Sequence, residues 1–451
     1  MTSVLTWTRA PGGASPIRSR RLAELQASHH AMWNYVTYRD AIGLVGLDPE
    51  ELYPGGTTRL PGDWTDLGWL TCFCGPPTAA VEAMRDAVSA EALNQYTPDL
   101  IGPLRDEAAR VLGRARDSGF EVIGTEGAQA GIALSLLASI DAGDEVIVPD
   151  PGYFHIPSAV IVAGGRPVAV PAGPQSGFRL DVDAVAGAIG PRTRAICIID
   201  PANPYGTVLD REQLAALADL AERHALLLIH DVTHAPLVID ASSAFTPLPA
   251  TGLTDRAVAT FSVSHCWGMA GARIGFLAGP PALMRGCLQL KAGITRLNTN
   301  LVSQHGALAA LRSGAYLPRA EEAIRANLAH LEGTLAGLPA LRLPVAPRRG
   351  LACAVEIDPA ATTAQELMVA LFARHIAVYP GDGLGEAIAA TTIRLNLSQP
   401  DPAAMERLRS ALPDALAEAA DGRWRRPVAE LLEQKGTPRA LRVAGIVRGR
   451  R

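Results

Sequence analysis

Seven short apolar runs, separated by helical segments, constrain the fold of this chain more than any other feature. Between about residues 78 and 315 they read FEVIG, DEVIVPD, RPVAVP, RAICIID, ALLLIHD, RAVATFSVS and ARIGFLAG. Each run is rich in valine and isoleucine and is hydrophobic on both faces, which is typical of a parallel strand covered by helices on either side. The pattern therefore predicts an α/β sheet domain.

The sequence around this sheet divides into further parts. Residues 1–65 combine a stretch rich in proline, glycine, serine and arginine, which we expect to be an arm, with an amphipathic helix over 19–41. The large domain is expected over 66–317. Residues 318–420 begin with a connector helix and continue with alternating strands and helices, which predicts a smaller α+β domain. The segment 421–451 carries nine basic and three acidic residues, and we expect a solvated, partly helical tail.

Composition argues against several classes of protein. The chain has 451 residues and a formal net charge of −4, so it has no general attraction for nucleic acid. No apolar run is long enough for a membrane span, and the N-terminus lacks the basic and apolar regions of a secretory signal, so we expect a cytoplasmic protein without membrane contact. The six scattered cysteines indicate reduced thiols rather than a disulfide framework.

Polar residues follow several of the apolar runs, at the strand ends where parallel sheets bind ligands. After FEVIG, the turn TEGAQAG opens a helix whose first backbone N–H groups would favour a phosphate. Asn203 follows RAICIID in a tight turn, and Asp231 ends ALLLIHD. A carboxylate there needs a cation, either a protonated ring nitrogen of a cofactor or an arginine. Ser262, Ser264 and Arg273 follow RAVATF and suit a phosphate.

From about residue 70 to 398, the chain resembles the class I/II aminotransferases, which are pyridoxal phosphate enzymes of fold type I. The resemblance rests on the motifs GDEVIVPDPGY at 143–153, DPANPYG at 200–206, HDVTH at 230–234, SVSHCWGMAGARIG at 262–275, YPGDGLG at 379–385 and IRLNLS at 393–398. It implies a large domain with a mostly parallel seven-stranded sheet and a smaller α+β domain. It also implies pyridoxal 5'-phosphate or pyridoxamine 5'-phosphate as cofactor and an amino or keto acid as substrate.

The resemblance implies cofactor contacts for individual residues. Asp231 matches the aspartate that keeps the pyridine nitrogen protonated, Asn203 matches the asparagine on the ring hydroxyl, and Tyr153 matches the aromatic residue stacked on the ring. The residues that fall where the family grips the phosphate are Gly127, Ala128, Gln129, Ser262, Ser264 and Arg273.

The resemblance also implies contacts with the substrate and with a second subunit. Arg394 matches the arginine that pairs with the substrate α-carboxylate, and Gly75 lies where the family's N-terminal segment approaches that group. Tyr96 matches a tyrosine that the neighbouring subunit donates. A homodimer with shared sites is therefore implied.

Two positions depart from the family pattern. His265 stands where the family has its Schiff-base lysine, and His234 stands where a tyrosine usually bonds the ring hydroxyl. The chain has two lysines, Lys291 and Lys435, and neither is at a position that the family uses. Imidazole forms no stable imine, but its ordinary pKa of about 6.5 suits proton transfer. We expect a non-covalently held cofactor, with His265, Asp231 and His234 as catalytic residues in transamination, elimination or a related reaction.

Two other hypotheses stay open at this point. The first is a non-catalytic protein that keeps the aminotransferase fold and binds a ligand or a partner. The second is a metal-dependent enzyme in which His230, His234, His265 and Asp231 form a new site, although histidines four apart at a strand end do not share one helical face. We expect no metal.

Overall fold

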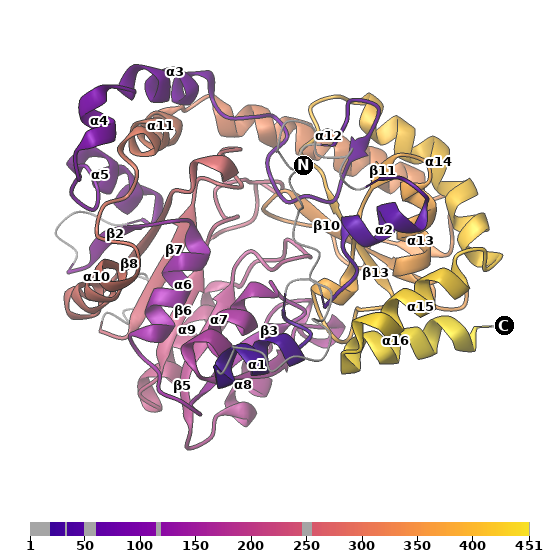
Figure 1. The fold of residues 1–451 in the computed structure, drawn as a ribbon, viewed down its shortest axis with the longest axis horizontal. Helices are drawn as coiled ribbons and strands as arrows, with labels where there is room; N and C mark the ends of the chain where they lie inside the picture. Colours follow the sequence, from indigo (N-terminus) through magenta and orange to yellow (C-terminus); the bar gives the residue numbers. More distant parts are fainter. Residues whose placement is uncertain (1–18, 32–33, 49–59, 114–118, 246–254, 451) are drawn as a thin grey trace, which may run out of the picture.

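The computed structural model describes residues 19–31, 34–48, 60–113, 119–245 and 255–450 (Figure 1). The arm expected at the start of the chain therefore lies almost entirely outside the described residues. Figure 1 shows a larger and a smaller lobe, with the long helix α12, Tyr316–Leu335, beside the smaller one. No helix within the described ranges is long and apolar enough to cross a membrane.

The seven expected strands form one sheet in the large domain. Six of them run parallel, and β8 runs opposite to both its neighbours in the order β2-β8-β7-β6-β5-β3-β4. The prediction of a mostly parallel seven-stranded sheet is therefore confirmed. The strands are Glu121–Thr125 (β2), Glu145–Asp150 (β3), Arg166–Pro171 (β4), Thr193–Ile199 (β5), Leu227–Asp231 (β6), Ala257–Ser262 (β7) and Gly275–Gly279 (β8).

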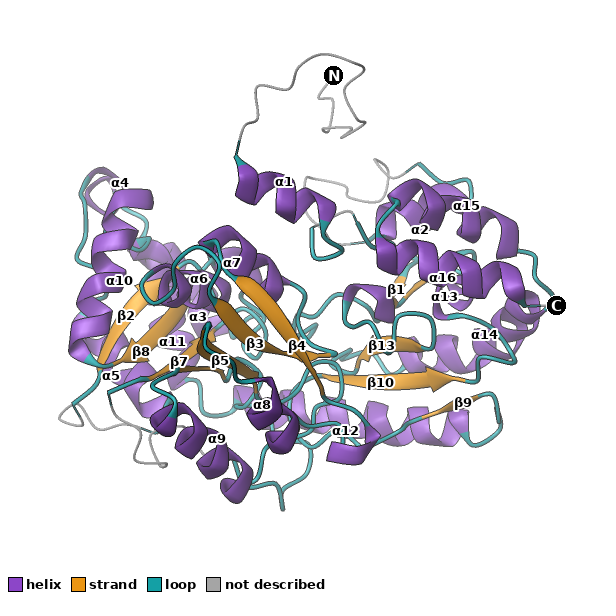
Figure 2. Cartoon of the chain, turned by 90° about the horizontal axis from the view of Figure 1, so that it is seen from below, coloured by secondary structure: helices purple, strands orange, loops and turns teal. Residues whose placement is uncertain are grey.

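Helices cover both faces of this sheet (Figure 2). Alternate residues of β3 show the arrangement: Val146 and Val148 pack with one helix layer, and Ile147 packs with the other. Since both faces are apolar, the strands read as continuous hydrophobic runs. The first layer contains α6 (Ala128–Leu137), α7 (His155–Ala163) and α10 (Pro281–Ile294). The second contains α8 (Val182–Ala188) and α9 (Arg211–Arg223). Beside β2 lies α5 (Gly102–Val111), and α11 (Leu301–Arg312) packs on α5, α3 (Thr78–Ala87) and α4 (Ala90–Asn94).

The smaller domain is an antiparallel sheet packed against helices. Its four strands, in spatial order, are Tyr379–Pro380 (β12), Thr392–Asn396 (β13), Ala352–Ile357 (β10) and Leu341–Arg342 (β9). Its helices include α13 (Ala364–Phe372), which is buried along its whole length, and α14 (Ala403–Ala420). A separate parallel pair joins β1 (Thr65–Asp66) to β11 (Ile376–Ala377). The segment that precedes the large domain therefore contributes to the small domain.

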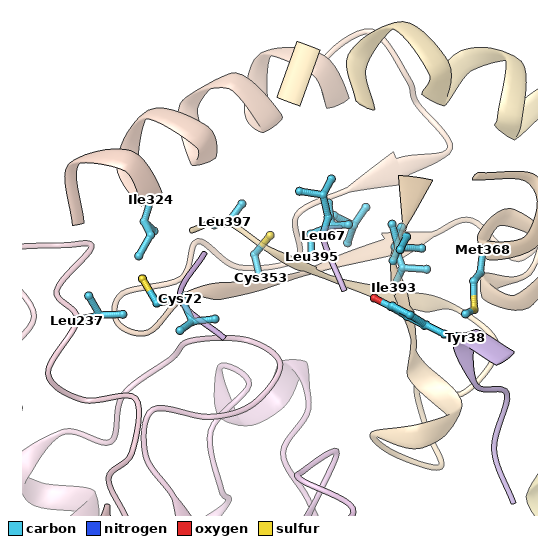
Figure 3. Close-up of a cluster of buried hydrophobic side chains, with 14 of the residues drawn as sticks. Tyr38, Leu67, Cys72, Leu237, Ile324, Cys353, Met368, Ile393, Leu395 and Leu397 are labelled. Carbon is cyan, nitrogen blue, oxygen red and sulfur yellow. The ribbon is translucent and has the colours of Figure 1, made fainter. Parts of the chain in front are cut away.

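One apolar core extends from the large domain into the small domain. Figure 3 shows Leu237, from the loop after β6, near Ile324 of α12 and Cys72. Tyr38 and Met368 belong to the same cluster at its small-domain end. The connector helix and the N-terminal segment thus share buried surface with both domains.

The helix expected over 19–41 is two helices, α1 (Arg20–Ala27) and α2 (Tyr38–Leu44). The second helix begins at a capping box, in which Thr37 and Asp40 satisfy each other's backbone N–H groups. α1 packs on α7 of the large domain, whereas α2 packs on α13 of the small domain. The prediction of one helix was wrong. The apolar spacing continues across the capping box at Thr37, and periodicity alone does not reveal that a new helix begins there.

The segment from residue 421 is not a solvated tail. It forms α15 (Arg425–Lys435) and α16 (Pro438–Gly449), which pack on each other and together are named the C-terminal hairpin. Several of its basic residues are paired with glutamates, as Arg448 is with Glu433. The overall charge of the segment therefore concealed two amphipathic helices. Their buried apolar residues are Val428, Ala429, Leu432, Ala440, Val443, Ala444 and Val447.

A buried carboxylate lies where β1 joins the small domain. Asp66 Oδ1 accepts hydrogen bonds from Tyr38 Oη (3.2 Å) and from the backbone N–H groups of Gly68 (3.0 Å) and Trp69 (3.1 Å). Burial raises the pKa of Asp66 to about 6, although these bonds act against the increase. Because the folded-state pKa lies above the unfolded value, the associated stability is present below about pH 4 and is lost as pH rises through 6.

We expect Asp66→Asn to become more favourable, relative to the native chain, as pH rises. The amide oxygen can keep the three accepted bonds and carries no charge that burial would penalise. Between pH 4.5 and 7 the difference in unfolding free energy should move by about 2 kcal/mol in favour of the variant. Urea unfolding at both pH values measures it, with Asp86→Asn on the exposed surface of α3 as control. An equal effect at both pH values would contradict the pKa given for Asp66.

Candidate active site

The ends of the parallel strands bring the expected polar residues to one edge of the large sheet. Ile199 of β5, Asp231 of β6 and Thr260 of β7 are neighbours in register. Asn203 therefore follows β5 on one side of Asp231, and Ser262 ends β7 on the other side. This edge is where open α/β sheets bind their ligands.

Asp231 holds an enclosed carboxylate at the end of β6. Its Oδ1 accepts hydrogen bonds from the Thr233 backbone N–H (3.0 Å) and from Thr233 Oγ1 (2.6 Å). Burial raises the pKa of Asp231, while the bonds from Thr233 and the nearby His230 act in the opposite direction. Among the described residues no arginine or lysine forms an ion pair with Asp231. A cationic group on a ligand would stabilise its ionised form.

His230 precedes Asp231 on β6 and therefore points to the opposite face of the sheet. Its Nε2 lies 3.3 Å from Asp200 Oδ2, and both side chains are buried. The part of the chain that the structure describes contains no group of three or more metal-binding side chains suited to an ion. The residues considered for a metal site, His230, His234, His265 and Asp231, therefore form no such group among the described residues, and strand alternation sets His230 apart from Asp231.

His265 and His234 lie side by side, with ring centroids 4.8 Å apart and planes 30° apart. His265 Nδ1 is hydrogen-bonded to the Leu70 carbonyl oxygen. Because a carbonyl can only accept, Nδ1 carries the hydrogen and Nε2 keeps its lone pair. Burial lowers the pKa of His265 to about 4, and burial together with the neighbouring His265 lowers that of His234 well below its ordinary value. Both rings are therefore neutral at pH 7.

The start of α6 forms a concave backbone site with Arg273. Gly127 has a φ of 98° and precedes the helix without any side-chain cap, so the first N–H groups of α6 face outward from the helix end. Arg273 Nη2 donates to the Glu126 carbonyl (2.6 Å), and a Cβ on Gly127 would come within 2.6 Å of that nitrogen. A Cβ on Gly275 would lie 2.4 Å from the carbonyl carbon of Gly127. The close packing of this turn therefore requires glycine at both positions.

The hydroxyls expected at the phosphate lie at the end of β7 and just after it. Ser262 and Ser264 are both buried, and the Ser264 backbone N–H is 3.4 Å from Ser262 Oγ. Ala128 and Gln129 form the first turn of α6, and the Ala128 carbonyl accepts from Thr260 Oγ1 (3.3 Å). β7 and α6 are thus directly linked at the site.

Arg394 reaches the site from β13 of the small domain. Its Nη1 lies 3.4 Å from Asn203 Oδ1, and its Nη2 donates to the Gly68 carbonyl (2.9 Å). The guanidinium carbon is 4.4 Å from the centroid of the Tyr379 ring. The buried Nε of Arg394 has no hydrogen-bond partner among the described residues. Burial lowers the pKa of Arg394, and the nearby tyrosines reduce this decrease. A buried guanidinium with an unused donor is suited to a carboxylate.

Three further expected residues lie at different distances from this centre. Tyr153 lies near Asp231. Burial raises the pKa of the Tyr153 hydroxyl, and the charge of Asp231 adds a smaller increase. Gly75 contacts the loop after His265, because a Cβ on Gly268 would lie 2.8 Å from the Gly75 carbonyl carbon. Tyr96 is 75% exposed and belongs to the surface of this single chain.

Sequence reasoning missed three contributors to the site. Thr233 holds Asp231, Leu70 orients His265, and Tyr379 supports Arg394. An Asp-x-Thr pattern is a known local turn signal, so HDVTH could have indicated Thr233. The Leu70 contact uses a backbone carbonyl far away in the chain, for which the sequence has no signal.

Both lysines of the chain are engaged in other contacts. Lys291 is 1% exposed, and its Nζ donates to Asp99 Oδ1 (2.7 Å), to the Gly124 carbonyl (2.8 Å) and to Thr299 Oγ1 (2.9 Å). Lys435 Nζ lies 2.7 Å from Asp40 Oδ2 in the small domain. All three hydrogens of the Lys291 ammonium are therefore used.

Known proteins are similar to this chain over most of its length. The family model described as "Aminotransferase class I and II" matches residues 66–412. The chain belongs to this family. Members are pyridoxal phosphate-dependent, so the cofactor that the resemblance implied is the cofactor of the family.

Individual proteins similar to this family member are named as aminotransferases. It is 32% identical over 356 residues to the arginine–pyruvate transaminase AruH of Pseudomonas aeruginosa, a match covering 76% of this chain and 88% of the relative. It is 31% identical to a probable aspartate/prephenate aminotransferase of Thermus aquaticus, covering 74% and 88%. A solved aspartate aminotransferase mutant of Thermus thermophilus superposes with a TM-score of 0.74 at 26% identity, covering 89% and 99% of the two chains.

We expect Arg273→Ala to weaken cofactor binding to this aminotransferase, because Arg273 is the cation beside the start of α6. Loss of a charge-assisted contact should raise the dissociation constant for pyridoxal phosphate about 10- to 100-fold. Quenching of tryptophan fluorescence during titration measures it. Arg285→Ala, at an exposed residue of α10, is the matched control. Equal affinities for the two variants would remove Arg273 from the phosphate site.

Proposed function

We propose that this aminotransferase-family enzyme binds pyridoxal or pyridoxamine 5'-phosphate without a covalent link and acts on an amino or keto acid with His265 as acid/base. One observation carries the proposal. An imidazole with a free Nε2 lies at the strand-end site, whereas both lysines are occupied by other partners. His265 also stands between the serines and the Gly-x-Arg-x-Gly pattern that flank the family's lysine.

The strand-end residues fit the chemical groups of this cofactor. Asp231 would hold the protonated ring nitrogen, a cationic partner that no described arginine or lysine provides to its carboxylate. Asn203 would bond the ring hydroxyl, and Tyr153 would cover one face of the ring. The phosphate would lie against the start of α6 and the residues Gly127, Ala128, Gln129, Ser262, Ser264 and Arg273. When bound, the cofactor supplies an electron sink for proton loss at the substrate α-carbon.

His265 performs the proton transfer in this proposal. The Leu70 carbonyl occupies Nδ1, so Nε2 is the atom that accepts and returns a proton. Since burial lowers the pKa of the ring to about 4, His265 is neutral and begins as a base at pH 7. His234 stacks on the His265 imidazole and would restrict the orientation of that ring.

Arg394 orients the substrate. Its guanidinium would bind the α-carboxylate through the face that Asn203 and Tyr379 leave open. The bond to the Gly68 carbonyl keeps the side chain directed toward the site before the substrate arrives. A preoriented arginine reduces the conformational freedom lost on binding.

The first test asks whether any lysine forms a covalent link with the cofactor. After incubation with pyridoxal phosphate and borohydride reduction, we expect no pyridoxyl adduct on Lys291 or Lys435 by peptide mass spectrometry. His265→Lys should give an adduct at residue 265, since it places an amine beside the same cofactor. An adduct on Lys291 in the native chain would overturn the proposal.

His265→Ala provides the companion measurement. It should abolish turnover of a responsive amino or keto acid and leave the pyridoxal phosphate dissociation constant within about twofold. Unchanged turnover would remove His265 from the mechanism. If no amino or keto acid alters the spectrum of the native loaded protein, the non-catalytic binding protein is the better description.

The exposed surface around Tyr96 supports a homodimer with shared sites. Tyr96 is 75% exposed, and the Arg296 guanidinium lies 4.8 Å from its ring centroid. A monomer rarely leaves several large apolar side chains together in water. Near Tyr96 and Arg296 in the chain, the exposed large apolar side chains are Val88, Leu93, Ile294 and Leu297. A second copy would cover them and receive Tyr96 at its own site.

We expect the native chain to elute at twice its mass of 47.3 kDa in size-exclusion chromatography with light scattering. Leu93→Asp should give the monomer, because it would place an unpaired charge in the interface. Leu441→Asp, at a half-exposed leucine of α16, is the control and should stay dimeric. A monomeric native chain would contradict the proposed shared site.

A further inference from the structure

The C-terminal hairpin lies beyond the part of the chain that matches the family. The family model ends at residue 412, whereas α15 and α16 span Arg425–Lys435 and Pro438–Gly449. Several of its arginines bond within the hairpin or at the molecular surface, and Arg448 with Glu433 is an example. Arg439 differs, because it is 6% exposed and bonds to another part of the small domain.

Arg439 holds one loop through two contacts. Its Nε donates to Glu386 Oε2 (2.7 Å), and its Nη1 donates to the Asp382 backbone carbonyl (2.7 Å). Arg442 adds an outer contact, with its Nε 2.6 Å from Glu386 Oε1. Residues 381–386, named here the crossing loop, are thus fixed at both ends by α16.

The crossing loop reaches the large domain directly before Tyr153. The Glu386 backbone N–H donates to Asp150 Oδ1 (2.9 Å), and the Gly152 backbone N–H donates to the Leu384 carbonyl (2.7 Å). A Cβ on Gly385 would lie 2.7 Å from the backbone Cα of Pro151, so the two backbones are closely packed. The position of the loop therefore determines the position of the chain that leads into Tyr153.

The same loop borders the substrate arginine. Tyr379 precedes it on β12, is paired in register with Arg394, and lies under the Arg394 guanidinium. A Cβ on Gly383 would lie 2.8 Å from Tyr379 Oη, so the loop also confines the tyrosine ring. One loop thus contacts the supports of both the cofactor ring and the substrate carboxylate.

We propose that Arg439 is a positioning residue for the active site. By holding the crossing loop against α16, it places Tyr153 over the cofactor ring and Tyr379 beneath Arg394. The inference rests on the proposed function, because that function assigns Tyr153 to the cofactor and Arg394 to the substrate. The guanidinium suits the role, since its planar fork bonds a carboxylate and a carbonyl at the same time.

The experiment compares Arg439→Gln with Arg448→Gln in the full chain. Hydrogen exchange of the cofactor-free protein reads the link directly, because the Gly152 amide should exchange about tenfold faster in Arg439→Gln. The pyridoxal phosphate dissociation constant and the KM for a keto acid should also rise about tenfold, with kcat changing less. Arg448→Gln removes an ion pair on the same helix and should stay within about twofold of the native chain in each measurement.

Partial rescue distinguishes positioning from general support of the fold. Arg439→Lys keeps the charge opposite Glu386 but cannot make both contacts, so it should recover part of the affinity. A folded Arg439→Gln with native exchange at Gly152 and native affinity would overturn the inference. If Arg439→Gln does not fold, Glu386→Gln repeats the test from a side chain that is 45% exposed, and native exchange there would likewise overturn it.

The two proposals fail in different ways. A native chain that binds no pyridoxal phosphate refutes the proposed function. Exchange at Gly152 is measured without the cofactor, so it still decides whether Arg439 holds the loop.

Discussion

Burial of both faces of the large sheet is the constraint on which the site depends. Helices cover the strands on either side, so polar side chains can meet a ligand only where the strands end. The register sets Ile199, Asp231 and Thr260 in a row at that edge. β8 runs against its neighbours, so its first residue, Gly275, meets the turn at Gly127. Strand direction thus explains why two glycines border the start of α6.

The charges around this edge are complementary to a particular kind of ligand. Among the described residues, Asp231 has no arginine or lysine as an ion-pair partner. Arg273 bonds to backbone carbonyl oxygens there, and Arg394 bonds to a backbone carbonyl oxygen and to an amide oxygen. The two histidines between them are neutral at pH 7 because burial lowers their pKa values. A ligand with one cationic and two anionic groups would satisfy all three charged side chains. A cofactor and a carboxylate substrate supply those groups together.

The sequence predicted the layers of the fold better than the contacts that complete the site. Parallel strands buried on both sides have an unmistakable composition, so the sheet and the polar strand ends followed from local patterns. The C-terminal hairpin did not, because its many arginines obscured the apolar spacing of Val443 and Val447. The orientation of His265 depends on the Leu70 carbonyl, which tertiary structure alone brings near. The roles of Tyr153 and Tyr96 came from family resemblance, since no local sequence pattern around either tyrosine indicates its role.

The full engagement of Lys291 has a consequence for how the cofactor is retained. Its three donors are taken by Asp99, Gly124 and Thr299, and under the proposed function this amine forms no imine with the cofactor aldehyde. Under the proposed function, the loaded fraction then follows the free concentration of vitamin B6 phosphate outside the protein, as for any reversible ligand. Dialysis would strip such a protein, and restoring the vitamer would refill it.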